Sequence, residues 1–217
     1  MNRKKITIIF DLDDTLYKEK KYKASGIRYV AKKIRYLYKQ NIAETLIAAD
    51  KKQMDIWLEA CKILKIDVTN AEQFKWLYRL HEPKIKLTKN TIETINALRK
   101  KSYNVAIFTE GRSYSQRMKL RELKLDKLKI YISDEMNTNK SDLKSFETII
   151  KELPAKKYFY IGDNPKKDFY LPNILEWETI GLIGNNNVHK QNIENLPNKN
   201  LPNVWVKDIK EILKFIN

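Results

Sequence analysis

The second half of the chain alternates short apolar runs with segments whose apolar residues recur at helical spacing. The runs are rich in Ile, Val, Phe and Tyr, which is typical of buried strands. We expect strands at 105–109, 129–132, 157–161 and 178–183, and helices between them near 113–123 and 142–151. A similar run, Lys5–Ile9, lies near the start of the chain. Strands that alternate with helices over short links form parallel sheets with right-handed crossovers. The sequence therefore predicts an α/β fold.

The stretch between the first strand and residue 88 carries no strand signal and reads as a set of packed helices. Apolar residues recur at helical spacing in two series, which are Ile27, Val30, Ile34, Leu37 and Tyr38, and then Met54, Trp57, Leu58, Cys61 and Leu64. Thr69 and Glu72 have the spacing of a capping box, which predicts a third helix through His81. We interpret both series as helix cores rather than as a cofactor site. A chain of 217 residues is long enough for one domain with such an insertion.

Two carboxylates, Asp11 and Asp13, follow directly on the first strand, and Thr15 comes two residues later. Ligands of open α/β sheets bind at the carboxyl ends of the strands. On an extended segment both side chains would project on one side, which suits joint capture of a hard cation such as Mg²⁺. The alternative is an acidic turn after a strand, because Asp also favours turns.

Polar residues also follow three later strands. The strand at 105–109 ends in Thr109, Lys140 lies beyond the strand at 129–132, and the strand at 157–161 continues into Gly162, Asp163 and Asp168. Each of these polar segments alone is weak evidence for a function. Together with Asp11 and Asp13 they make four segments in a fixed order, each behind an expected strand, and that combination is specific. Together they resemble the four signatures of the haloacid dehalogenase-like (HAD) superfamily of hydrolases. The resemblance covers nearly the whole chain and is closest to the phosphatase branch with a helical cap between the first and second signatures.

The resemblance implies a Rossmann-like parallel sheet core with an inserted α-helical cap. The catalytic core would comprise residues 1–16 and 88–217, and the cap residues 17–87. It also implies roles for two carboxylates. Asp11 would attack phosphorus and form an aspartyl-phosphate, and Asp13 would act as general acid and base.

The resemblance further implies a Mg²⁺ cofactor and a phosphate site. Mg²⁺ would be held by Asp11, by the backbone carbonyl of Asp13 and by Asp163, with Asp168 in the outer shell. Thr109 and Lys140 would bind the phosphoryl oxygens. Lys140 is one of 35 lysines, so its assignment depends on order and spacing, and Asp168 could instead cap a helix or form a surface ion pair.

The segment after Thr109 departs from the pattern of many relatives, which have Asn or Asp where this chain has Glu110. That position often faces the substrate in the family. Glu110, Gly111 and Arg112 are therefore candidates for substrate contacts, and the alternative for Glu110 and Arg112 is a solvated side chain.

Charge and cysteine content bear on partners and location. The chain has 43 Lys and Arg against 27 Asp and Glu, a net charge of +16, with the densest basic patch between Lys18 and Lys39. This excess could indicate a nucleic-acid-binding module, a membrane-surface helix or only AT-rich codons. The single cysteine, Cys61, fits a reducing cytoplasm. The apolar run near the start is too short for a signal peptide. We expect a cytoplasmic location and neither a nucleic acid nor a membrane as partner.

The predicted function is a Mg²⁺-dependent phosphatase that hydrolyses a small phosphorylated metabolite through an aspartyl-phosphate. Asp13 argues against the dehalogenase branch, which lacks the second aspartate. A phosphomutase of the same chemistry and a basic nucleic-acid-binding module with little turnover are the alternatives. The residues specify neither the substrate nor an oligomeric state.

Overall fold

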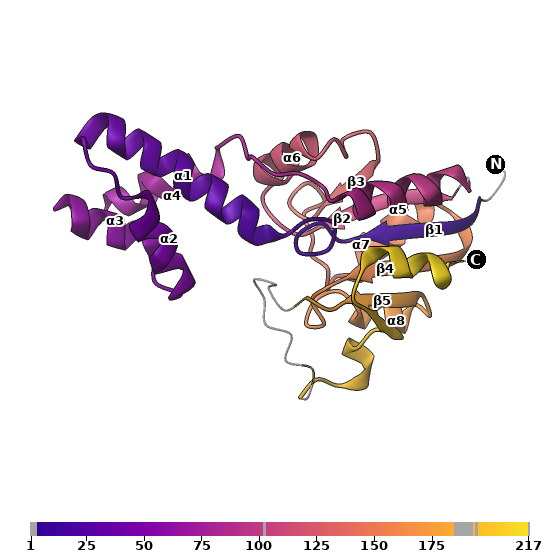
Figure 1. Cartoon of the computed structure of the whole chain (residues 1–217). Coiled ribbons are helices and arrows are strands. Elements are labelled where there is room, and N and C mark those ends of the chain that lie inside the picture. The colour runs from indigo at the N-terminus through magenta and orange to yellow at the C-terminus, as the bar shows by residue number, and fades with distance from the viewer. Residues whose placement is uncertain (1–3, 102, 185–192, 194, 217) are drawn as a thin grey trace.

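A six-stranded parallel sheet forms the larger part of the molecule, in the strand order β3-β2-β1-β4-β5-β6 (Figure 1). The computed structural model describes residues 4–101, 103–184, 193 and 195–216. The strands are β1 (Lys4–Phe10), β2 (Asn104–Thr109), β3 (Lys129–Ile132), β4 (Ala155–Gly162), β5 (Glu178–Leu182) and β6 (Val204–Val206). The predicted α/β fold with a Rossmann-like parallel sheet is thereby confirmed.

The central strand β1 is buried on both faces, which is why its sequence is a nearly continuous apolar run. Ile6, Ile8 and Phe10 point into one hydrophobic cluster, whereas Ile9 points into another on the opposite face. This alternation is the period of two that a strand imposes on its side chains. Because β1 pairs with both β2 and β4, its carboxyl end lies beside theirs.

Helices follow most of the strands and cover the sheet. They are α5 (Lys89–Lys100), α6 (Ser113–Glu122), α7 (Leu143–Glu152) and the short α8 (Tyr170–Ile174), with two 3-10 segments, η1 (Asn198–Asn200) and η2 (Ile209–Lys214). The sequence from Ile209 to Phe215 also predicts a closing helix, which the structure forms as the 3-10 helix η2, and α8 was not predicted. The Asn-rich stretch 184–203 is expected from its sequence to be an exposed loop. It lies partly outside the described residues, and η1 falls within its described part.

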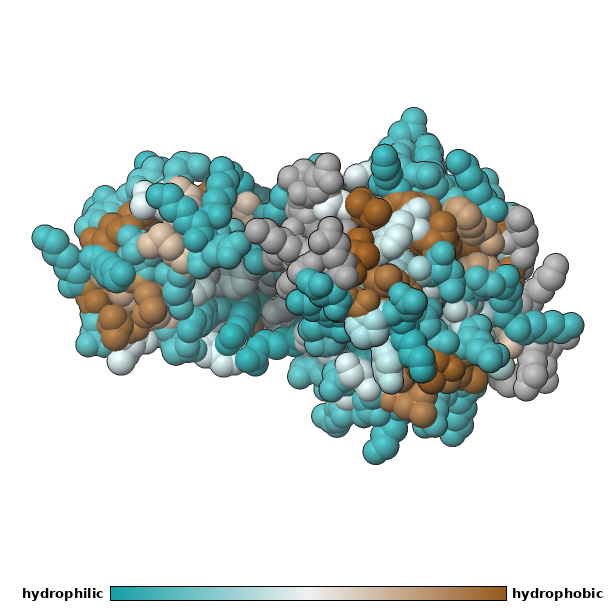
Figure 2. All heavy atoms as spheres, turned by 90° about the horizontal axis from the view of Figure 1, so that it is seen from below, coloured by the Kyte–Doolittle hydropathy of each residue, from teal (hydrophilic) through white to brown (hydrophobic). Residues whose placement is uncertain are grey.

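Four helices form a separate lobe, which we call the helical lobe: α1 (Glu19–Tyr38), α2 (Ala43–Lys51), α3 (Ile56–Leu64) and α4 (Asn70–Arg79). They pack around a hydrophobic cluster of their own, which includes Val30, Trp57 and the buried Cys61. Figure 1 shows this lobe standing apart from the sheet, and Figure 2 shows a mostly hydrophilic surface with hydrophobic patches on both parts. The lobe lies where the cap was expected, and its exact limits at 17 and 87 stay a prediction.

Details of the helical lobe differ from the sequence-based expectations. Helix α2 was not predicted. The capping box at Thr69 was wrong, because the Thr69 hydroxyl donates to Asp67 Oδ1 at 2.6 Å and makes no cap bond to α4. Several residues expected in the helix cores are instead exposed, because they lie at helix ends or on outer faces: Leu37, Tyr38, Met54 and Leu58. None of the described helices is long and apolar enough to cross a lipid bilayer.

Candidate active site

The candidate site lies at the carboxyl edge of the sheet, where β1, β2 and β4 end side by side. Phe10 is in register with Ile107 of β2 and with Ile161 of β4, and the Asp11 amide still donates to the Ile161 carbonyl at 2.8 Å. Asp11 therefore leaves the sheet at the level of Gly162. Side chains from all three strand ends meet here, as the rule for open α/β sheets predicts.

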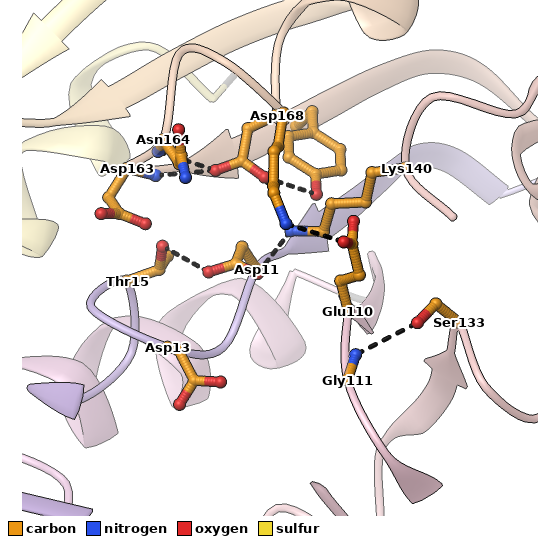
Figure 3. A network of polar contacts seen from close by, with 12 residues as sticks. Asp11, Asp13, Thr15, Glu110, Gly111, Ser133, Lys140, Asp163, Asn164 and Asp168 are labelled. Atoms are coloured by element: carbon orange, nitrogen blue, oxygen red, sulfur yellow. Dashed lines mark hydrogen bonds and ion pairs between the residues drawn. The ribbon is translucent and has the colours of Figure 1, made fainter. Parts of the chain in front are cut away.

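Asp11 is buried at the centre of this site and accepts two side-chain hydrogen bonds (Figure 3). The Thr15 hydroxyl donates to one carboxylate oxygen at 3.0 Å, and the Lys140 ammonium donates to the other at 2.5 Å. Burial raises the pKa of Asp11 to about 7, although the positive charge of Lys140 opposes this shift. The site thus holds a carboxylate whose ionised form depends on nearby cations.

Lys140 is also buried and bridges Asp11 to Asp168, to which its ammonium donates at 2.6 Å. Burial alone lowers a lysine pKa, but the charges of Asp11 and Asp168 outweigh it and raise the pKa of Lys140 well above its ordinary value. Lys140 is therefore a fixed positive charge beside Asp11, the kind of group that stabilises a transferring phosphoryl group.

Asp168 holds the loop after β4 in place. One of its oxygens accepts hydrogen bonds from the backbone amides of Asp163 at 3.1 Å and Asn164 at 2.8 Å. The other oxygen accepts from Lys140 and, at 3.4 Å, from the hydroxyl of Tyr160. The surface ion pair that sequence left open for Asp168 is excluded, since the residue is buried.

Three buried carboxylates, from Asp11, Asp163 and Asp168, place one oxygen each within 4.8 Å of one another. Burial, reinforced by the charges of Asp11 and Asp168, raises the pKa of Asp163 to about 9. Ionised carboxylates this close together repel one another, and a divalent cation bound between them would relieve the repulsion. The donor set contains oxygen only, which fits Mg²⁺ better than zinc.

Asp13 points away from this cluster and toward α6 (Figure 3). Its two oxygens each accept from the Lys119 ammonium at 2.8 Å, and they also accept from the Gln116 amide at 3.1 Å and from the Tyr17 hydroxyl. The chain turns at Asp14, where φ is 56°, so the segment is not extended. The prediction that the side chains of Asp11 and Asp13 project on one side of an extended segment is therefore wrong, and their joint capture of a cation stays untested.

The partners of Asp13 shift its protonation. Burial raises the pKa of a carboxyl group, but the Lys119 charge and the hydrogen bonds from Lys119, Tyr17 and Gln116 outweigh it and lower the pKa of Asp13. Sequence reasoning missed these three residues. The signal available was the i, i+3 spacing of Gln116 and Lys119 on one face of the expected helix after Arg112.

Thr109, the last residue of β2, is buried beside Asp11's strand. Its hydroxyl has no hydrogen-bond partner among the described residues. A buried hydroxyl without a partner is costly and uncommon, so a ligand oxygen is a natural partner for it. This observation agrees with a phosphate-binding role for Thr109.

The segment after Thr109 forms one wall of the site. Glu110 pairs with Lys167 from the loop after β4 at 2.7 Å, and this pair outweighs burial in lowering the pKa of Glu110. Gly111 adopts a φ of 151°, which favours glycine, and its amide donates to the Ser133 hydroxyl at 3.1 Å. Arg112 is exposed and directs its guanidinium toward Trp76 of α4.

Sequence comparison agrees with this geometry. A profile of the haloacid dehalogenase-like hydrolases matches residues 8–170, which include every carboxylate of the site. The chain belongs to this family. No curated protein shows significant sequence similarity to it.

Solved structures of other HAD hydrolases share the fold. The HAD-hydrolase YfnB from Bacillus subtilis, bound to magnesium, superposes with a TM-score of 0.66 at 18% identity over 100% of both chains. A 2-haloacid dehalogenase from Pseudomonas syringae superposes with a TM-score of 0.62 at 15% identity over 97% of both chains. A HAD phosphatase from Thermococcus onnurineus superposes with a TM-score of 0.59 at 20% identity over 96% of both chains. At these identities the similarity shows the fold, which both phosphatases and dehalogenases use.

Proposed function

We propose that this HAD hydrolase is a Mg²⁺-dependent phosphatase that hydrolyses a small phosphorylated metabolite in the cytoplasm. The observation that carries the proposal is the buried Asp11 at the end of β1, with Lys140 at 2.5 Å and Asp163 in the same carboxylate cluster. This arrangement supplies a nucleophile, a positive charge for the phosphoryl oxygens and a set of oxygen ligands for a cation.

In the proposed reaction the Asp11 carboxylate attacks phosphorus, and the bond from phosphorus to the alcohol oxygen breaks. The alcohol takes a proton from Asp13. Asp13 then takes a proton from water, which attacks the aspartyl-phosphate and releases inorganic phosphate with the free Asp11 carboxylate. Lys140 and Thr109 hold the phosphoryl oxygens in both steps.

Mg²⁺ would be held by Asp11, Asp163 and the Asp13 backbone carbonyl, and would neutralise charge on the phosphoryl group. Asp168 would stay in the outer shell, where it already binds Lys140 and the loop amides. Because the Asp13 carboxylate faces Lys119, its side chain must turn toward Asp11 to exchange a proton with the leaving group. A rotation of this kind is a side-chain movement and needs no change in the sheet.

Asp13 separates this proposal from dehalogenation. A carbon–halogen bond breaks without protonation of its leaving group, so a dehalogenase does not require a second aspartate. Here that aspartate is supported by three side chains, Tyr17, Gln116 and Lys119. These contacts stabilise the ionised form of Asp13, so it must leave Lys119 to gain the proton that the leaving alcohol receives. A carboxylate kept at this position suits a phosphate ester, whose leaving group needs that proton, better than a carbon–halogen bond.

The decisive experiment measures phosphate release from a panel of phosphorylated metabolites, with and without Mg²⁺, by the wild type and by Asp11→Asn. We expect Mg²⁺-dependent release that is abolished in Asp11→Asn while the far-UV circular dichroism stays unchanged. Substantial turnover by purified Asp11→Asn would rule out the nucleophile assignment. Isomerisation of a sugar phosphate in place of phosphate release would favour the phosphomutase alternative.

A basic groove along α1 supports a second candidate function, nucleic-acid binding. Seven basic side chains line it against three acidic ones, and five of the basic residues, Lys20, Lys21, Arg28, Lys32 and Lys33, belong to α1. Tyr29 and Tyr36 also line the groove and could stack on bases. Tight binding of single-stranded DNA or RNA that weakens steeply with salt would support this function. The absence of binding at moderate salt would exclude it, which is the outcome we expect.

A further inference from the structure

Two arginines meet at the junction between the helical lobe and the sheet. Arg79 lies in the last turn of α4, and Arg112 directly precedes α6. The Ser115 hydroxyl, in the first turn of α6, donates to the Arg79 carbonyl at 3.1 Å. This bond joins the end of α4 to the start of α6 and so brings the two arginines together at this junction.

Both guanidinium groups pack against one indole, that of Trp76. The Cζ atom of Arg79 lies 5.3 Å from the centre of the ring and that of Arg112 lies 5.7 Å from it, so the two charges are at most about 11 Å apart. Contacts of this kind are cation–π interactions, and they orient a guanidinium without neutralising its charge. Trp76 is 49% exposed, so a solute can reach the pair.

Neither arginine forms a close ion pair in the described part of the chain, although Glu72 attracts Arg79 at longer range. Neither has a carboxylate within 4.0 Å among the described residues, whereas Arg117 of helix α6 forms a bidentate pair with Glu135 at 2.8 and 2.5 Å. Glu72, the acidic residue nearest Arg79 in sequence on α4, is bonded to Lys75 at 2.7 Å. Two guanidinium groups beside one exposed ring, neither in a close ion pair, favour the binding of an anion there.

Arg112 is linked to the site by a short segment of chain. Arg112 follows Thr109 by three residues, which can span no more than about 11 Å. The Gln116 amide donates to the Glu110 carbonyl at 3.0 Å and to Asp13 at 3.1 Å, and so fastens this segment to the proposed proton donor. A group attached to the leaving oxygen can therefore extend from Asp13 toward Arg112.

We propose that Arg79 and Arg112 form a second anion site, and that the preferred substrate is a phosphate monoester with a further anionic group, a carboxylate or a phosphate, on its leaving group. A guanidinium offers two parallel N–H donors to either anion. The inference rests on the proposed phosphatase function wherever it is tested by hydrolysis rates. It adds the class of leaving group, which the proposed roles of Asp11 and Lys140 leave open.

The test compares substrates that differ only in the second anion. One pair is 3-phosphoglycerate and glycerol 3-phosphate, and the other is 1,3-propanediol bisphosphate and 3-hydroxypropyl phosphate. We expect kcat/KM to favour the anionic member of at least one pair by about ten-fold or more, since hydrogen bonds to charged groups are the strong ones. The pair that shows this preference identifies the anion as carboxylate or phosphate.

Variants then assign the preference to the two arginines. Arg79→Gln and Arg112→Gln should each reduce the ratio of kcat/KM values about ten-fold, mainly through KM, and Arg112→Lys should restore it in part. Arg121→Gln is the matched control, because Arg121 is an exposed arginine in the last turn of α6, the helix that Arg112 precedes. A wild-type ratio near one in both pairs, or an equal loss in Arg121→Gln, would overturn the proposal.

A binding measurement separates this inference from the proposed function. Trp76 is the most exposed of the four tryptophans, so its fluorescence should respond to an anion beside it. In Asp11→Asn, 1,3-propanediol bisphosphate and 3-phosphoglycerate are titrated separately, and we expect saturation with at least one, lost in Trp76→Phe and weakened in Arg112→Gln. If no monoester is hydrolysed, the phosphatase function fails and this titration still decides the anion site. If monoesters are hydrolysed without preference and the fluorescence does not respond, the anion site alone fails.

Discussion

Lys119 is the residue that sets the direction and charge of Asp13. Its ammonium is buried, lies 2.8 Å from both Asp13 oxygens and stands 4.2 Å from the centre of the Tyr22 ring in α1. Because Tyr22 belongs to the helical lobe, this lysine contacts both the proposed acid–base group and the lobe. Its ion pair is largely shielded from solvent and should therefore count for more than a surface pair.

Lys119→Met should lower the free energy of unfolding by about 1–3 kcal/mol near neutral pH, since a mostly buried carboxylate loses its charged partner. Asp13→Asn should offset part of this loss when the two changes are combined. Urea unfolding of the two single variants and the double variant measures the coupling. The exposed Lys127→Met serves as control, and strictly additive losses at Asp13 and Lys119 would contradict the prediction.

Asp163 should make the stability of the metal-free protein depend on pH. With a folded-state pKa of about 9, against about 4 when unfolded, Asp163 keeps a proton that the unfolded chain releases between these values. The folded state then binds more protons, so this contribution to stability falls as the pH rises through that window. Mg²⁺ requires the ionised carboxylate and should reverse the loss.

We therefore expect Mg²⁺ to raise the Tm more at about pH 8 than at about pH 6, because protons compete with the metal. Asp163→Asn should remove most of this increment and flatten the pH dependence of the metal-free Tm. Differential scanning calorimetry with and without Mg²⁺ checks both statements. An increment that is equal at the two pH values in the wild type would refute the assignment.

At the scale of an element, the end of β4 is built around the carboxylate that follows it. Gly162 closes the strand, and a Cβ there would lie 2.5 Å from Asp168 Oδ2 and 2.7 Å from its Cγ. The strand and its loop therefore fit together only when the last residue has no side chain. This close approach lets Asp168 reach the amides of Asp163 and Asn164 together with Lys140.

Gly162→Ala should displace Asp168 and cost about 1–3 kcal/mol of stability through overpacking. It should also abolish the increase in Tm that Mg²⁺ produces, because the loop that carries Asp163 shifts. Gly181→Ala in β5 is a matched control. A Cβ there would lie 2.3 Å from Trp205 of the neighbouring strand β6, on the side of β5 away from the site. We expect that control to lose stability and to keep the Mg²⁺ effect, as measured by thermal unfolding with and without Mg²⁺.

At the scale of the whole molecule, the helical lobe and the sheet have separate hydrophobic cores. The lobe's cluster shares no buried member with the two clusters that flank the sheet. Two tyrosines connect them: Tyr22 of α1 is a buried member of one sheet cluster, and Tyr78 packs against both that cluster and the lobe's own. The chain passes between the lobes twice, before α1 and after α4. Separate cores with few connections favour opening of one lobe without the other.

Cys61 offers a direct measure of that opening, because it is the only cysteine and lies fully buried in the helical lobe. Burial also raises the pKa of its thiol, so labelling requires the lobe to open. Phe74→Leu, in the same cluster, should accelerate labelling by a thiol reagent about ten-fold. Phe146→Leu, packed against the sheet, should leave the rate nearly unchanged, and equal acceleration by both would show one cooperative unit.

The sequence by itself determined the strands, the parallel α/β fold and the sheet edge that carries the site. These features depend on local patterns: a strand buried on both faces must be apolar, and a polar residue that follows it must leave the sheet at its carboxyl end. The family resemblance then placed Asp11, Lys140, Asp163 and Asp168 at one edge, where the structure brings them together. Helix α2 was not predicted. The exposure of Leu37, Tyr38, Met54 and Leu58 was missed because helical spacing does not show which apolar side chains the neighbouring helices cover.

Only the tertiary structure decided which side chains meet. Lys119 contacts Asp13 across 106 residues of chain, Lys140 contacts Asp11 across 129, and Arg112 reaches Trp76 from the other lobe. Spacing along a strand placed Asp13 beside Asp11, but the turn at Asp14 sends its carboxylate to α6. Contacts between elements depend on how the helices cross the sheet edge, and that geometry is set by the packing of whole faces, which no local pattern records.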